Sequence, residues 1–163
     1  GIIQSDYGEG HGKSTAAIGN AIRCASEGKS VIIIQFLKGK NENELAFLNR
    51  LEPEIKIFRF AKSDESFEEL SEQEQQEEAM NLRNGFNYGK KVVTTAACDM
   101  LILDEVLGVI DEKVVAPQEM QELFENKPDD MTLVCTGRVL EDSIRPYADE
   151  IYNIAPEKIR IDE

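Results

Sequence analysis

An α/β fold, with a mostly parallel sheet and helices on both faces, is predicted by three observations. Short apolar runs alternate with segments of helical character along all 163 residues. The runs at 31–34 and 100–103 are continuously apolar, which is typical of strands buried on both faces. Glycine or polar residues follow several runs, as expected where parallel strands end at a ligand-binding edge. We expect one domain over residues 1–163, a length sufficient for a substantial core.

The elements follow from local patterns. Strands are expected at residues 2–5, 31–34, 54–60, 100–103, 131–135 and 151–154, and helices at 13–26, 41–51, 79–97, 118–126 and 142–148. The alanines of the first helix allow close packing on a sheet, and Gly28 suits the left-handed position that follows a helix. Pro117 begins the fourth helix. Gly85 and Gly89 argue against regularity in the third.

The segment at 62–78 is dominated by acids and glutamines, and two interpretations stay open. The favoured one is a solvated loop or helix face. The alternative is a mobile cover over a binding site, with Phe67 and Leu70 as its apolar anchors.

The stretch between the first strand and helix reads Gly8-Glu9-Gly10-His11-Gly12-Lys13-Ser14-Thr15. Glycines at every second position let the backbone curl into a nest of N–H donors, and the next helix directs its positive end there. Lys13 adds charge for the outer phosphates, and the Ser14 hydroxyl suits Mg²⁺. The common pattern has another glycine where this chain has Tyr7. We predict a compact ATP-binding loop within a P-loop NTPase-like (RecA-like) fold.

Polar residues at other strand ends complete the predicted site. Asp104 and Glu105 follow a buried strand, where one carboxylate can bind Mg²⁺ while the other polarises a nucleophile or also reaches the metal. Arg138 is either a phosphate ligand or a surface residue in a glycine turn. Gln35 and Lys38 are either substrate contacts or ordinary strand-end residues.

Composition excludes several classes of protein. The net charge of −14 opposes binding to nucleic acid, because phosphate backbones are repelled. No apolar run approaches the roughly 20 residues of a membrane helix. The three cysteines are widely spaced in apolar or alanine-rich segments, which predicts buried thiols in a reducing, cytoplasmic compartment.

With these motifs the chain resembles the P-loop ATP:corrinoid adenosyltransferases, which act on cob(I)alamin or cob(I)yrinic acid a,c-diamide. Residues 8–17 are similar to their loop, with His11 where lysine is usual and Ser14 where threonine is usual. Residues 33–39, 101–105 and 136–138 are similar to later motifs of the family, and the likeness covers nearly the whole chain.

The resemblance implies a transferase of cobalamin biosynthesis that uses ATP and Mg²⁺, with a corrinoid as substrate. Its Co(I) would attack the ribose 5′ carbon of ATP and release triphosphate, and Lys13 would stabilise the charge on this leaving group. A reductase that donates electrons and a homodimeric state are further expectations. The alternatives are an ATPase or kinase that cleaves the γ-phosphate, and a non-catalytic ATP-binding module that recruits a partner through residues 62–78.

Overall fold

The computed structural model describes residues 1–37 and 47–160. Over these residues the chain forms a six-stranded sheet, and every neighbouring pair of strands is parallel. The strands are β1 (Ile3–Tyr7), β2 (Val31–Gln35), β3 (Ile55–Arg59), β4 (Met100–Asp104), β5 (Thr132–Gly137) and β6 (Glu150–Asn153). Their order is β3-β2-β4-β5-β1-β6, so β5 separates the strand before the glycine loop from the strand that ends in Asp104.

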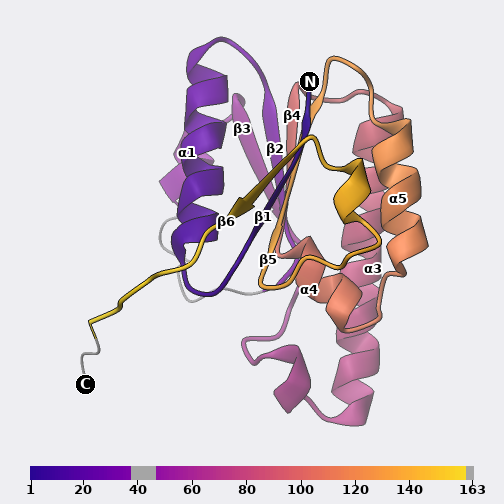
Figure 1. The fold of residues 1–163 in the computed structure, drawn as a ribbon. Helices are drawn as coiled ribbons and strands as arrows, with labels where there is room; N and C mark the ends of the chain where they lie inside the picture. Colours follow the sequence, from indigo (N-terminus) through magenta and orange to yellow (C-terminus); the bar gives the residue numbers. More distant parts are fainter. Residues whose placement is uncertain (38–46, 161–163) are drawn as a thin grey trace.

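Helices cover both faces of this sheet, which confirms the predicted fold class (Figure 1). Helix α1 lies on one face, and α3, α4 and α5 lie on the other. The helices are α1 (Gly12–Ser26), α3 (Glu72–Thr94), α4 (Val106–Asp111) and α5 (Pro117–Asn126), with short 3-10 turns η1 (Asn49–Leu51), η2 (Phe67–Glu69) and η3 (Arg145–Tyr147). None of the helices in the described part of the chain is long and apolar enough to cross a membrane.

Small side chains hold α1 close to the sheet, as predicted. Ala17, Ala21 and Cys24 are buried against Ile33 and Ile102 of the strands beneath them. Gly28 has a φ of +83° just after the helix, in the left-handed region expected there. The first turn of α1 is thereby fixed over the carboxyl edge of the sheet.

The opposite face carries the larger part of the core. Leu82 and Phe86 of α3 are fully buried against the sheet, and burial of side chains of this size contributes about 1.5–3 kcal/mol each. The glycines of α3 do not interrupt it. A Cβ at Gly85 would lie 3.1 Å from the ring of Phe60, so glycine lets the helix pack closely at this point.

Several boundaries differ from the sequence predictions. Helix α3 begins at Glu72 rather than at residue 79, because Ser71 and Glu74 form a capping box of reciprocal 3.2 Å hydrogen bonds. The helix predicted at 142–148 is wrong, since the described structure there is the short turn η3, which contains Pro146. Helix α4 was not predicted. The helix predicted at 41–51 lies largely outside the described residues.

All three cysteines are free and buried, as expected. Cys24 lies in α1, Cys98 between α3 and β4, and Cys135 in the middle of β5. Burial raises the pKa of Cys98 to about 12, and it also raises the pKa of Cys135.

Candidate active site

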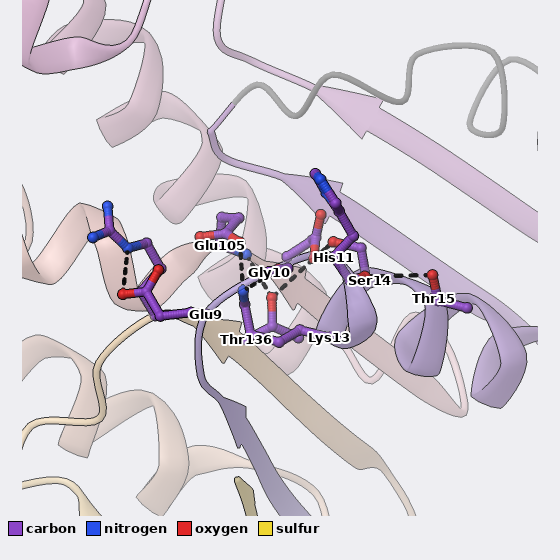
Figure 2. Close-up of polar contacts among 10 residues, drawn as sticks. Glu9, Gly10, His11, Lys13, Ser14, Thr15, Glu105 and Thr136 are labelled. Atoms are coloured by element: carbon purple, nitrogen blue, oxygen red, sulfur yellow. Dashed lines mark hydrogen bonds and ion pairs between the residues drawn. The ribbon is translucent and has the colours of Figure 1, made fainter. Parts of the chain in front are cut away.

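The predicted site residues meet where β1, β4 and β5 end (Figure 2). Parallel strands place their carboxyl ends at one edge of a sheet, and the loop after β1 lies over that edge. The Lys13 side chain, the hydroxyl groups of Ser14 and Thr136, and the carboxylates of Asp104 and Glu105 come together there.

Lys13 is held inside the site. Its side chain is 3% exposed, and its ammonium group donates a 2.9 Å hydrogen bond to the carbonyl oxygen of Gly10. The same nitrogen lies 3.9 Å from a carboxylate oxygen of Glu105. The charge of Lys13 therefore faces the acidic pair and the glycine loop together.

Thr136 connects the two acidic residues. Its hydroxyl donates to Asp104 Oδ1 at 2.8 Å and accepts from the backbone N–H of Glu105, also at 2.8 Å. Ser14 approaches the same Asp104 oxygen at 3.4 Å. Glu105 has a φ of +64°, a left-handed conformation that is uncommon for a residue with a side chain and tends to cluster at functional sites.

The surroundings of Asp104 and Glu105 disfavour the charged form of both carboxyl groups. Burial raises the pKa of Asp104, although hydrogen bonds from Thr136 and Ser14 and the charge of Lys13 lower it in part. Burial, followed by the charge of Asp104, raises the pKa of Glu105, and Lys13 again opposes the shift. Both carboxylates would gain from a further positive charge.

A cavity of about 520 Å³ opens beside this cluster, a volume within the range of small-ligand pockets. One wall comes from the glycine loop and α1, and the other from residues 61–68. Its lining includes apolar side chains as well, among them Ile18, Leu37 and Phe67. A ligand with both charged and apolar parts fits such a lining.

The structure distributes the predicted ligand-binding residues over two groups. Eight of them line the cavity: Gly10, His11, Lys13, Ser14, Gln35, Asp104, Glu105 and Arg138. Gly8, Glu9, Gly12 and Thr15 are not part of the lining, and the Thr15 hydroxyl instead donates to the carbonyl oxygen of His11 at 3.4 Å. Lys38 lies outside the described residues.

Two of the uncertain candidates have distinct surroundings. Gln35 is 5% exposed and neighbours Asp104 across β2 and β4, and its Oε1 finds no partner among the described residues. A buried acceptor of this kind is costly unless a donor reaches it. The Arg138 side chain is 64% exposed and donates to Glu9 at 3.3 Å. Glu9 lies to one side of the main cluster (Figure 2).

The far wall of the cavity was not predicted in detail. Glu78 of α3 is buried, and its carboxylate accepts from the backbone N–H groups of Lys62 and Ser63 at 2.9 and 2.7 Å. This holds the segment that carries Phe67 beside the cavity, so part of residues 63–68 lies at the site, as the cover interpretation expects. Residues 72–77 form a mostly exposed face of α3, as the favoured interpretation of a solvated helix face expects. The sequence signal for this role was the spacing of Glu78 four residues before Leu82, which places both side chains on the buried side of α3.

The donor set at the acidic cluster fits Mg²⁺. Asp104, Glu105 and Ser14 offer hard oxygen ligands, and the two carboxylates lack full compensation of their charge. No group of three or more His, Cys, Asp or Glu side chains within residues 1–37 and 47–160 is arranged to hold a metal alone. Magnesium in nucleotide sites commonly uses one or two carboxylates together with water and substrate phosphates.

Comparison with known proteins agrees with this chemistry. The family model described as ATP:corrinoid adenosyltransferase BtuR/CobO/CobP matches residues 1–163. The chain is 28% identical over 162 residues to the corrinoid adenosyltransferase of Escherichia coli K12, covering 99% of this chain and 80% of that protein. It is 29% identical over 162 residues, with the same coverage, to the corrinoid adenosyltransferase CobA of Salmonella typhimurium. The chain therefore belongs to the ATP:corrinoid adenosyltransferase family.

Proposed function

We propose that this enzyme transfers the adenosyl group of ATP to the cobalt of a corrinoid at the edge where β1, β4 and β5 end. Membership of the family supports adenosyl transfer over γ-phosphate cleavage and over a purely binding role. The observation that carries the placement is the meeting of Lys13, Ser14, Asp104 and Glu105 beside one cavity.

In this proposal the glycine loop binds the triphosphate. The N–H groups of residues 8–15 and the amino end of α1 would face the phosphate oxygens, with Lys13 among them. Asp104, Glu105 and Ser14 would hold Mg²⁺, which supplies further positive charge next to the phosphates when it is bound.

The reaction needs charge stabilisation more than proton transfer. Two electrons of Co(I) form the bond to the 5′ carbon, the bond from that carbon to oxygen breaks, and its electron pair leaves with the triphosphate. Charge then develops on the leaving group, where the loop amides and Lys13 are placed to stabilise it. No general base is required, and none is assigned.

The second substrate would lie at the mouth of the cavity. A volume of about 520 Å³ suits one nucleotide, and a corrin macrocycle with its substituents is too large to enter beside it. Phe67 and Leu37 supply apolar surface in the lining. Such surface would help to exclude water from the cobalt.

The deciding experiment is product analysis. The protein is incubated with ATP, Mg²⁺ and a chemically reduced corrinoid, and the visible spectrum of the corrinoid is followed while phosphorus NMR identifies the phosphate product. Inorganic triphosphate together with the adenosylated spectrum is the expected result. ADP and inorganic phosphate would favour the ATPase or kinase alternative, and unchanged ATP would favour the binding module.

Removal of the lysine charge tests the placement of the site. We expect Lys13→Ala to weaken ATP binding roughly 10- to 150-fold, the range for loss of a hydrogen bond to a charged group. Calorimetric titration with ATP and Mg²⁺ measures the change. Lys29→Ala is the control, because Lys29 is an exposed lysine that pairs with Glu27 beyond the end of the same helix. Equal affinities of the two variants would contradict the placement.

Three further proposals concern the cellular setting. Production of Co(I) requires an electron donor, and a reductase would serve as that partner. The resemblance to the family also suggests a homodimer, which sedimentation would test. The three free, buried cysteines support a reducing, cytoplasmic location.

A further inference from the structure

The chain that follows β6 lies against the outer side of the glycine loop. The backbone N–H of Ile154 donates to the carbonyl oxygen of Tyr7 at 2.7 Å, which extends the pairing of β6 with β1 up to the start of the loop. The next residues continue past the loop itself. Ile154 and Pro156 lie beside the loop glycines and are not among the residues that line the cavity.

The three loop glycines all face this segment. A Cβ at Gly8 would lie 2.2 Å from the carbonyl oxygen of Ile154, and one at Gly12 would lie 2.9 Å from Ile154 Cγ2. A Cβ at Gly10 would lie 3.1 Å from Cδ of Pro156. Glycine at every second position of the loop therefore leaves room for the loop to pack beside Ile154 and Pro156.

At Gly12 the need for glycine comes from packing alone and not from backbone conformation. Gly8 and Gly10 have φ values of +138° and +87°, which side chains rarely adopt. Gly12 is the first residue of α1 and has no such requirement. Among the described residues, the atom that a Cβ at Gly12 would meet within 4 Å is Ile154 Cγ2.

Two further features describe how the loop is held. His11 is the N-cap residue of α1, and its side chain makes no capping hydrogen bond. Gly8 is held from the opposite side by a 3.1 Å hydrogen bond from its N–H to the carbonyl oxygen of Gly137. The loop is thus placed between the end of β5 and the segment that begins at Ile154.

We propose that Ile154 is a positioning residue for the phosphate loop, its side chain acting through its proximity to Gly12, while the backbone carbonyl of Ile154 lies beside Gly8. Its side chain does not line the cavity, so it acts on ATP through the shape of the loop. The inference rests on the proposed role of residues 8–15 as the triphosphate site. It extends the functional unit to a segment nearly 150 residues away in sequence.

The test is a set of single and double variants assayed by binding. Dissociation constants for ATP with Mg²⁺ and for inorganic triphosphate are measured by calorimetry for Ile154→Ala, Ile154→Val, Gly12→Ala and Gly12→Ala combined with Ile154→Ala. Ile151→Ala is the control, since Ile151 is a partly exposed isoleucine in β6. Denaturant unfolding of each variant shows whether the fold is kept.

The expected pattern is specific. Ile154→Ala weakens binding of both ligands about tenfold, whereas Ile154→Val, which keeps both branches at Cβ, and Ile151→Ala bind like the wild type. Gly12→Ala alone weakens binding more strongly, and the double variant recovers to the level of Ile154→Ala. If Ile154→Ala does not fold, Gly12→Ala/Ile154→Leu, which lacks the obstructing Cγ2 methyl, must bind more tightly than Gly12→Ala, and absence of this recovery would overturn the inference.

Two results would overturn the inference. One is wild-type affinity in Ile154→Ala. The other is a double variant whose dissociation constant rises by the product of the fold-changes of the two single variants. The latter would mean that a side chain at position 12 disturbs the ligand and not the contact with Ile154. Because the readout is binding of triphosphate, a protein that binds it but forms no adenosylated corrinoid would refute the proposed function while leaving this inference supported.

Discussion

At the scale of single residues, Thr136 organises the acidic cluster through one hydroxyl group. It satisfies a buried oxygen of Asp104 and the partly buried N–H of Glu105. The motif at 136–138 included this position, but a threonine at a strand end is common in sequence, so the role of its hydroxyl was not predicted. Arg138, two residues later, was the more conspicuous candidate and is the more exposed side chain.

Thr136→Val is expected to lower the free energy of unfolding by about 1–3 kcal/mol, because it leaves the N–H of Glu105 without its acceptor. Urea denaturation measures the loss. Thr132→Val in the same strand is the matched control, since Thr132 is only partly buried. A similar, small change in the free energy of unfolding of both variants would show that the hydrogen bonds of the Thr136 hydroxyl contribute little to stability.

Asp6 is a buried carboxyl group whose effect on the stability of the fold depends on pH. It is fully buried, one of its oxygens has no partner among the described residues, and burial raises its pKa although a hydrogen bond from Gln4 opposes the shift. A folded-state pKa above the unfolded value means that stability is lost as the pH rises through this window. The window begins near the ordinary value of 3.8 and extends upward.

We therefore expect Asp6→Asn to gain stability relative to the wild type as the pH rises from about 4 to 7. The asparagine can keep the hydrogen bond from Gln4 and cannot ionise. Guanidinium unfolding at several pH values gives the difference between the two proteins. A difference that stays constant, or that shrinks toward pH 7, would contradict the assignment.

At the scale of elements, the long helix α3 both packs the core and supports the cavity wall. Its buried stripe of Leu82, Phe86 and Val93 was visible in sequence, because apolar residues at helical spacing indicate a packed face. Its first two turns were not recognised, since acids and glutamines suit a solvated loop equally well. The capping box at Ser71 was the local signal that distinguishes the two.

Glu78 links α3 to the cavity wall through ionic hydrogen bonds. Burial alone would raise its pKa, but hydrogen bonds from Asn81 and from the N–H groups of Lys62 and Ser63 lower it overall. Its contribution to stability is therefore present above the unfolded pKa and is lost as the pH falls through the folded one.

Glu78→Gln is expected to destabilise the protein by about 1–3 kcal/mol, since its new amide group cannot accept from both N–H groups. It should also raise the KM for ATP or corrinoid, because residues 62–68 form part of the cavity wall. Thermal unfolding and steady-state kinetics measure the two effects. Glu77→Gln, on the exposed side of α3, should change neither; an equal effect in both variants would show that charge alone matters.

The elements near the site show where sequence reasoning reaches its limit. The glycine loop, the buried strands and the acidic strand end were predicted because each has a strong local pattern. Helix α4 was not, because it begins after a non-glycine residue in a left-handed conformation, and such a conformation depends on tertiary contacts. The packing of Ile154 and Pro156 beside the loop was not predicted either, since these residues are far from the loop in sequence.

At the scale of the whole molecule, the charge is strongly negative, whereas the proposed site would bind a polyphosphate. The net charge of −14 repels anions at long range, and in the proposed site the local field of Lys13, the loop amides and α1 would have to overcome it. A net charge of this size also works against compactness through repulsion among the carboxylates.

The temperature of half-unfolding is therefore expected to rise by several degrees between about 10 and 200 mM sodium chloride, as salt screens this repulsion. Differential scanning calorimetry at neutral pH measures the change. Lower stability in salt would indicate that favourable ion pairs outweigh the repulsion.

The three buried thiols have a consequence for how such an enzyme can be handled. Cys24, Cys98 and Cys135 are unpaired, so the fold contains no cystine that a reductant could open. Their thiolates, the reactive form, are suppressed by burial. In the proposed reaction, a potent electron donor that reduces the cobalt would therefore meet no disulfide to open among the described residues.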